Sequence, residues 1–120
     1  MKKILFIDDS KMQLQVLRGL LKKDYEVFTS ESGFDGIDVA KKQQPDVIFL
    51  DYGMPVISGT ETLERLRMNE KTKHIPVVFL TGVDDKEEAT IALKLKPQGY
   101  LLKPVTREQL EDTIRKVTTE

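Results

Sequence analysis

The sequence predicts an α/β fold in which a five-stranded parallel sheet is covered by helices on both faces. Three short uninterrupted apolar runs, at residues 4–7, 47–50 and 77–80, are typical of strands buried on both faces. Segments with helical periodicity separate the predicted strands, and strands and helices alternate strictly. This alternation favours a doubly wound sheet with right-handed crossovers, for which the simplest strand order is 2-1-3-4-5.

Length and composition narrow the class of protein. A chain of 120 residues corresponds to one domain, residues 1–120, and the absence of cysteine excludes a disulfide framework and a cysteine nucleophile. Lys and Arg total 19 against 20 Asp and Glu, a balance that argues against a nucleic-acid surface. The apolar runs are too short for a signal peptide or a membrane span, so we expect a cytoplasmic protein with no membrane partner.

The first half of the chain contains two predicted helices and an edge strand. Ser10 and Gln13 form a capping box for the first helix, and Ser32 caps a second helix that ends before Pro45. Residues 25–29 are short, partly alternating and flanked by polar residues, as expected of an edge strand. The apolar faces predicted for these helices are Met12, Val16, Leu17, Leu20 and Leu21 in the first, and Phe34, Ile37 and Ala40 in the second.

The second half of the chain contains three further predicted helices, and a predicted strand precedes each of the last two. Ser58 caps a third helix, Asp84 caps a fourth and Thr106 caps a fifth, with a capping box at the third and the fifth. The strand at residues 77–80 precedes the fourth helix, and a last strand at residues 99–102 precedes the fifth. The predicted apolar faces are Leu63 and Leu66, then Ala89, Ala92, Leu93 and Leu95, and finally Leu110, Ile114 and Val117.

Polar residues follow four of the predicted strands. Asp8 and Asp9 come after the first, Asp51 after the third, Thr81 after the fourth and Lys103 after the fifth. The carboxyl ends of parallel strands share one edge of the sheet, so these side chains should converge there. Three crowded carboxylates need protons or a cation, and an oxygen-only ligand set suits Mg²⁺. One carboxylate could then attack phosphorus, while the lysine and the threonine hold the transferred phosphoryl oxygens.

With these residues at its strand ends, the sequence resembles the receiver domains of two-component response regulators. The chemotaxis regulator is the single-domain type of this family. The resemblance covers the whole chain and rests on the acidic pair, the stretch DYGMPVISG that begins at Asp51, Thr81 followed by Gly82, and YLLKP at residues 100–104. Thr81, Tyr100 and Lys103 follow Asp51 by 30, 49 and 52 positions, a spacing typical of the family. The resemblance implies a flavodoxin-like fold.

The resemblance also implies a role for each residue at the predicted edge. Asp51 corresponds to the phosphoacceptor, which takes a phosphoryl group from a phosphohistidine on a sensor histidine kinase or phosphotransfer protein. Asp9, Asp51 and the backbone carbonyl of Gly53 would bind Mg²⁺ directly, and Asp8 would act through a metal-bound water. The domain would then be a switch with only self-phosphorylation and self-dephosphorylation chemistry, rather than an enzyme.

In the family, the threonine and an aromatic residue pass the signal onward. Thr81 would move toward the phosphoryl group and Tyr100 would turn inward behind it, although an aromatic residue in a strand is more often simple packing. The output face of the fourth helix, fifth strand and fifth helix would then bind a downstream effector or support a phosphorylation-dependent homodimer. The resemblance further implies a cis peptide bond between Lys103 and Pro104.

The chain departs from the family pattern in two places. Gly53 and Val83 occupy positions that tune hydrolysis of the acyl phosphate, and neither can orient a water molecule, so we expect self-dephosphorylation to take minutes or longer. Lys96 and Pro97 stand where many members have glycine and alanine, which leaves the choice of partner open.

Two other functions are compatible with the residues. A small Mg²⁺-dependent phosphohydrolase would use Asp51 as its covalent nucleophile, but the sequence offers no substrate domain and no general acid beyond the acidic pair. A receiver that only binds partners would lack the chemistry, which the complete acidic, threonine and lysine set argues against. The only histidine, His74, lies in a lysine-rich loop and is interpreted as a surface residue.

Overall fold

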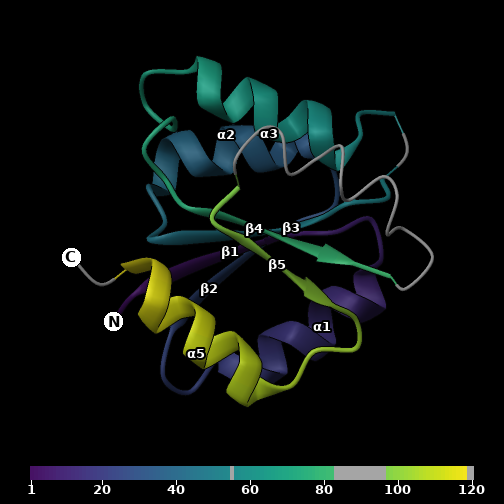
Figure 1. Ribbon diagram of the computed structural model, residues 1–120, viewed down its shortest axis with the longest axis vertical. Coiled ribbons are helices and arrows are strands. Elements are labelled where there is room, and N and C mark those ends of the chain that lie inside the picture. The colour runs from purple at the N-terminus through teal and green to yellow at the C-terminus, as the bar shows by residue number, and fades with distance from the viewer. Residues whose placement is uncertain (55, 83–96, 119–120) are drawn as a thin grey trace.

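A computed structural model describes residues 1–54, 56–82 and 97–118. Five parallel strands form one sheet in the order β2-β1-β3-β4-β5, which confirms the predicted order (Figure 1). The strands are β1 (Lys3–Ile7), β2 (Glu26–Ser30), β3 (Val47–Asp51), β4 (Val77–Thr81) and β5 (Gly99–Leu102). The helices are α1 (Lys11–Leu21), α2 (Gly33–Gln43), α3 (Gly59–Met68) and α5 (Arg107–Thr118). The helix predicted after Asp84 lies outside the described residues.

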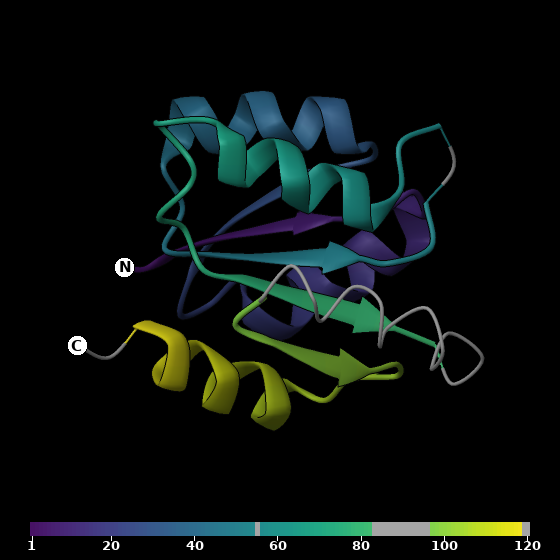
Figure 2. The ribbon, with the colours of Figure 1, turned by 45° about the horizontal axis from the view of Figure 1, so that its top comes forward.

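The helices form a layer on each side of the sheet. Figures 1 and 2 show α2 and α3 side by side on one face and α1 and α5 on the other. Successive strand residues therefore enter different cores: Leu5 and Ile7 pack under α2 and α3, whereas Phe6 packs with Phe49 toward α1 and α5. The rings of Phe6 and Phe49 stack at 5.2 Å between centroids. Burial on both faces explains why these strands read as uninterrupted apolar runs.

The apolar face predicted for α1 is partly wrong. Leu14, Leu17 and Leu21 are the buried residues of this helix, whereas Met12 and Val16 are 77% and 54% exposed. The helix carries two neighbouring apolar stripes with the same spacing, and the stripe that includes Leu14 faces the sheet. Periodicity identified the helix but could not select the stripe.

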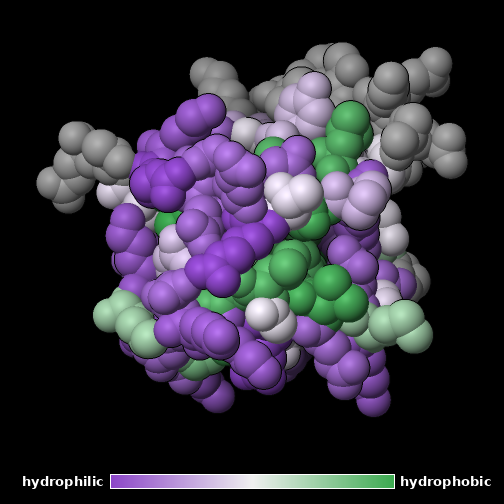
Figure 3. All heavy atoms as spheres, turned by 90° about the horizontal axis from the view of Figure 1, so that it is seen from below, coloured by the Kyte–Doolittle hydropathy of each residue, from purple (hydrophilic) through white to green (hydrophobic). Residues whose placement is uncertain are grey.

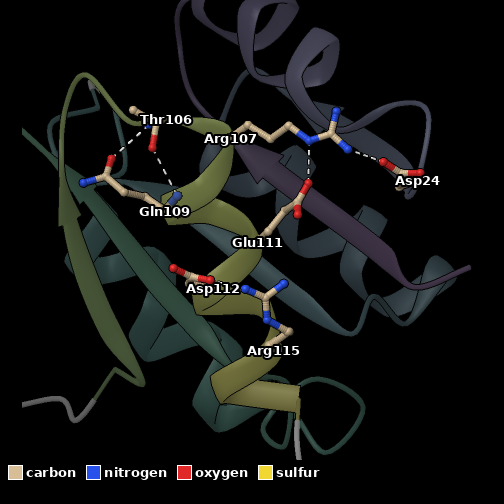
Figure 4. Close-up of polar contacts among 7 residues, drawn as sticks. All are labelled: Asp24, Thr106, Arg107, Gln109, Glu111, Asp112 and Arg115. Atoms are coloured by element: carbon tan, nitrogen blue, oxygen red, sulfur yellow. Dashed lines mark hydrogen bonds and ion pairs between the residues drawn. The ribbon is translucent and has the colours of Figure 1, made fainter.

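Helix starts follow the predicted caps. The side chains of Ser10, Ser32 and Ser58 each accept a hydrogen bond from the backbone N–H three residues later. A reciprocal capping box is present at α5, where Thr106 N–H donates to Gln109 Oε1 and Gln109 N–H donates to Thr106 Oγ1 (Figure 4). At α1 the arrangement differs from the prediction, because Ser10 N–H donates to the carboxylate of Asp8 at 2.9 Å.

Three ion pairs lie on the outer surface of α5, and one of them reaches another segment of the chain. Arg107 pairs with Glu111 one turn later, at 2.5 Å from Nε to Oε1, and with Asp24 in the loop between α1 and β2 (Figure 4). Arg115 pairs with Asp112 on the same helix. Exposed pairs of this kind are weak, because water and salt screen them. Of these three pairs, only the one between Arg107 and Asp24 joins α5 to another part of the chain.

Arg67 stabilises the amino edge of the sheet through hydrogen bonds. Its guanidinium donates to the carbonyl of Ile75 at 2.8 Å and to Gln98 Oε1 at 2.8 Å. The same Gln98 oxygen accepts the N–H of Val77, while Gln98 N–H donates to the Val77 carbonyl. This network joins the end of α3 to the starts of β4 and β5.

The two ends of the described chain meet at the same edge. Lys2 Nζ donates to Thr118 Oγ1 at 2.5 Å, which links the start of β1 to the end of α5. Figures 1 and 2 show both ends on this side, opposite the arrowheads of the strands.

Candidate functional site

The candidate site lies at the carboxyl edge of the sheet, where the strand arrowheads end in Figure 2. Asp51 is the last residue of β3 and Thr81 is the last residue of β4. Asp8 follows β1 directly, and Lys103 follows β5 directly. Parallel pairing in register brings these four chain segments to one edge, although they are far apart in the sequence.

Lys103 joins two of the carboxylates. Its Nζ atom lies 2.8 Å from Asp51 Oδ1 and 3.3 Å from Asp8 Oδ2. Asp8 and Asp51 are nearly inaccessible, with 2% and 6% of their surface exposed. A buried pair of carboxylates is therefore neutralised in part by one ammonium group.

Asp9 completes an acidic cluster with Asp8 and Asp51. One carboxylate oxygen from each of the three residues lies within 4.8 Å of the others, and Asp9 is the exposed member. Hard oxygen ligands of this kind fit Mg²⁺, which usually takes one or two carboxylates and keeps several waters. The exposed side of the cluster leaves room for those waters.

The remaining residues predicted for the site have different surroundings. Thr81 is buried at the end of β4, and Gly53 is exposed in the loop two residues after Asp51. Tyr100 lies on β5 in register with Phe79, and 48% of its surface is exposed. The peptide bond between Lys103 and Pro104 is cis. His74 is exposed in the loop before β4, away from the acidic cluster.

Burial dominates the electrostatics of Asp51. It raises the pKa of the Asp51 carboxyl above its usual range; the hydrogen bond from Lys103 opposes this effect, and the negative charge of Asp8 adds to it. The pKa of Lys103 is also raised: burial lowers it, but the hydrogen bond and charge of Asp51, together with Asp8, outweigh burial. The lysine therefore stays charged at neutral pH, and ionised Asp51 is held at a cost in stability.

This cost predicts the effect of Asp51→Asn on the metal-free protein. Because the pKa of Asp51 is higher in the folded state, its carboxylate lowers stability once the pH exceeds the pKa of the unfolded chain. We expect the variant to be more stable than the wild type at neutral pH, with the difference shrinking as the pH falls through the pKa of Asp51. Urea unfolding in EDTA at several pH values measures this difference in stability between the variant and the wild type. A more stable wild type at neutral pH would contradict the sign.

Backbone contacts fix the two buried carboxylates. Asp8 N–H donates to the Ser30 carbonyl at the end of β2, and its side chain accepts the N–H of Ser10. Behind Asp51, a Cβ atom on Gly59 would lie 2.6 Å from the Asp51 carbonyl oxygen, so α3 can start this close only with glycine. This contact was not predicted. Its only sign in the sequence is the glycine directly after the cap of α3, and α2 also begins with a glycine after its cap, which meets other residues.

Comparison with known proteins places this site in a family. The response regulator receiver domain model matches residues 4–115. The chain belongs to the response regulator receiver domain family. This receiver domain is 33% identical over 118 residues to Protein PilH of Pseudomonas aeruginosa, with 98% of each chain covered. It is 27% identical to the polar-differentiation response regulator DivK of Brucella ovis, covering 95% of this chain and 94% of that protein.

Solved structures agree with the sequence comparison. The receiver domain superposes on a response regulator receiver domain protein from Clostridium thermocellum with a TM-score of 0.90 at 34% identity, covering 98% of this chain and 94% of that one. The chemotaxis protein CheY4 of Vibrio cholerae gives a TM-score of 0.88 at 33% identity, with 98% of both chains covered. The predicted flavodoxin-like fold is thereby confirmed, and the protein is a receiver domain of two-component signalling.

Over residues 1–54, 56–82 and 97–118, no helix is long and apolar enough to cross a bilayer.

Proposed function

We propose that Asp51 accepts a phosphoryl group from the phosphohistidine of a sensor histidine kinase or phosphotransfer protein, in a reaction that needs Mg²⁺. The observation that carries the proposal is the contact of Lys103 with both Asp51 and Asp8 beside a third carboxylate. A nucleophilic oxygen, a fixed ammonium group and a set of metal ligands are thus gathered at one edge. Phosphoryl transfer depends mainly on such positioning and charge stabilisation.

In the proposed reaction, an Asp51 carboxylate oxygen attacks phosphorus and forms an acyl phosphate. The bond from phosphorus to the imidazole nitrogen breaks, and its electron pair returns to the partner's histidine. Lys103 and the hydroxyl of Thr81 hydrogen-bond the phosphoryl oxygens. Asp8, Asp9 and Asp51, with the backbone carbonyl of Gly53, would hold Mg²⁺. When bound, the metal supplies positive charge against the carboxylates and the phosphoryl oxygens.

We propose that the signal leaves the site through β4 and β5. Thr81 is buried at the end of β4, and its neighbour in register on β5 is Leu102, two residues after the half-exposed Tyr100. A hydroxyl that moves toward a phosphoryl group would vacate space behind it, which Tyr100 could fill by turning inward. The surface of β5 and α5 would change as a result. A downstream effector, or a second phosphorylated copy, would read that change.

Intact-mass spectrometry after incubation with acetyl phosphate tests the proposal. The wild type is expected to gain one labile phosphoryl adduct in the presence of Mg²⁺, and none in EDTA. Asp51→Asn should gain no adduct, and the unfolding measurements described above would show that it is folded. If the wild type gains no adduct with any divalent metal, the domain binds partners without this chemistry.

The same samples followed over time test the lifetime of the acyl phosphate. Gly53 carries no side chain, and a Cβ atom built there would meet nothing within 4 Å. Residue 83 lies outside the described part of the chain, but valine has no polar group to orient a water molecule. We therefore expect the adduct to decay over minutes or longer, and decay within seconds would contradict this expectation.

An exposed apolar patch on α1 supports the proposed protein partner. Helix α1 starts two residues after Asp9, and Met12 and Val16 expose their side chains on its first two turns. Figure 3 shows apolar atoms gathered on the face where α1 and α5 lie. An apolar surface beside a charged site fits a protein that carries the phosphohistidine better than it fits a small phosphoester. We place this encounter in the cytoplasm, a compartment that suits a chain without cysteine.

Val16→Asp is expected to separate the two phosphoryl donors. The added charge should lower the rate of transfer from a phosphorylated histidine phosphotransfer protein by about tenfold or more, since it disrupts an apolar contact. Labelling by acetyl phosphate should stay unchanged, because the site itself is intact. Gln15→Asp adds the same charge on the neighbouring exposed position and is the matched control. An equal loss of rate with both phosphoryl donors would show that the substitution damages the site itself and not the docking of the phosphotransfer protein.

A further inference from the structure

We propose that Val56 is a contact point for the protein that donates the phosphoryl group, and that its side chain distinguishes this donor from a small phosphoryl compound. The inference rests on the proposed role of Asp51 as phosphoacceptor. Val56 lies in the loop that joins β3 to α3, which stands at the carboxyl edge of the sheet (Figure 2). Its backbone conformation is unfavourable, and its side chain is almost fully exposed.

The backbone of Val56 is in the left-handed region, with a φ of 66°. This region is unfavourable for a residue with a Cβ atom, and most of all for a β-branched residue, whereas glycine and asparagine tolerate it. The other described non-glycine residue with a positive φ is Gln44, which caps α2 and whose side-chain amide donates to the Lys71 carbonyl at 2.9 Å. Valine has no polar group with which to make a compensating contact of this kind.

Burial does not compensate for the conformation of Val56 either. Its side chain is 91% exposed, more than any other large apolar side chain in the described part of the chain. A glycine or an asparagine at this position would therefore keep the fold and relieve the strain. Because the fold gives no reason for an exposed valine in this conformation, we look for the reason in a partner outside the chain.

The loop around Val56 is anchored to the rest of the domain. Gly59 N–H donates to the Tyr52 carbonyl at 3.1 Å, which closes the loop at its base. On either side of Val56 in the sequence, Met54 and Ile57 are buried in the core under α2 and α3. These two buried side chains hold the loop, so Val56 projects outward between them.

Both ends of the loop stand beside Asp51. Tyr52 follows it directly, and a Cβ atom on Gly59 would lie 2.6 Å from the Asp51 carbonyl oxygen. Val56 comes three residues before Gly59, so the two Cα atoms are at most about 11 Å apart. Asp51 is nearly inaccessible, so a phosphohistidine can reach it only if the protein that carries it contacts the surrounding loops. A single helix, about 10–12 Å wide, would cover the distance to Val56.

Val56 and the exposed apolar residues of α1 lie on two sides of the acidic cluster. The neighbouring strands β1 and β3 lead to α1 on one face of the sheet and to α3 on the other (Figure 2). A protein that reaches Asp51 can touch both sides, whereas acetyl phosphate is too small to touch either. This position favours the phosphoryl donor over a downstream effector, because an effector has no need to reach Asp51.

Transfer from two donors to Val56→Asn tests the proposal. The protein donor is a purified histidine phosphotransfer protein that has been phosphorylated beforehand, and acetyl phosphate is the small donor. The variant should accept from the protein about fivefold more slowly, or worse, because it loses an apolar contact. Its labelling by acetyl phosphate and its affinity for Mg²⁺ should stay unchanged. Its midpoint of urea unfolding should rise, because asparagine tolerates the left-handed region.

Two further variants separate the side chain of Val56 from the strain of its backbone. Val56→Leu keeps an apolar side chain and should accept from the protein donor at close to the wild-type rate. Met68→Asn is the matched control, because Met68 is also exposed and apolar but lies at the last residue of α3, at the other end of the helix from the site. It should change neither rate.

The outcomes distinguish this inference from the function on which it rests. Transfer from the protein to Val56→Asn at the wild-type rate overturns the inference, as does an equal slowing with acetyl phosphate or a lower midpoint of urea unfolding. In each of these cases the wild type still accepts the phosphoryl group. A wild type that accepts it from neither donor would overturn the proposed function, and the role of Val56 with it.

Discussion

Lys103→Met is expected to lower the rate of labelling by acetyl phosphate about 100-fold or more at saturating Mg²⁺. The ammonium group lies 2.8 Å from the oxygen of Asp51 and is held between two buried carboxylates. In the proposed reaction it meets the charge that grows on the phosphoryl oxygens. Methionine keeps most of the side-chain length and removes the charge, so the loss reports on charge stabilisation instead of on packing.

Metal binding should survive the same substitution. Lys103 and a divalent cation compete for the negative charge of Asp8 and Asp51, so the variant should bind Mg²⁺ at least as tightly as the wild type, by titration calorimetry. Lys73→Met is the control, because Lys73 pairs with the exposed Glu70 far from the site. Labelling of Lys103→Met at the wild-type rate would remove the lysine from the mechanism, whereas loss of metal binding would show that the pocket has collapsed.

Phe49→Ala is expected to lower the free energy of unfolding by about 3–5 kcal/mol. Phe49 is fully buried in β3, stacks on Phe6 and lies between β1 and β4. The loss is a large part of the stability of a typical domain and should lower the melting temperature by roughly 10–20 °C. Urea unfolding followed by circular dichroism measures it.

Phe34→Ala removes the same atoms from an exposed position. It should cost about 1 kcal/mol or less, because Phe34 is half-exposed and loses mainly its contact with Arg65. A similar loss in both variants would mean that the cavity left by Phe49 is not the cause.

The sheet could be predicted because its three central strands, β1, β3 and β4, are buried on both faces. Residues 47–50 and 77–80 are uninterrupted apolar runs, and each is followed by residues that break regular structure before the next predicted helix. Strand order followed from the alternation of elements together with a preference for the simplest arrangement. The exposed face of α1 could not be predicted, because Val16 and Leu17 belong to neighbouring stripes that periodicity treats alike.

The sequence predicted which residues would lie together at one edge of the sheet, but it did not predict the contacts among their side chains. Strand ends indicated that Asp8, Asp51 and Lys103 would meet. That the lysine would bridge two carboxylates depends on the side-chain conformations at that edge, which a linear pattern does not contain. The close approach of Gly59 to Asp51 depends on the packing of α3, and glycine at a helix start gives too little information to reveal it.

The hydrogen bond between Lys2 and Thr118 makes the chain a candidate for circular permutation. Because Lys2 and Thr118 lie within reach of one side-chain hydrogen bond, a short linker could join the two ends of the described chain, so little entropy is lost on closure. New ends could be opened in the loop at residues 69–74, which precedes β4 at the same edge of the sheet. A fluorescent reporter attached there would sit across the full length of the strands from Asp51, where it could follow the state of the domain without obstructing its acidic edge.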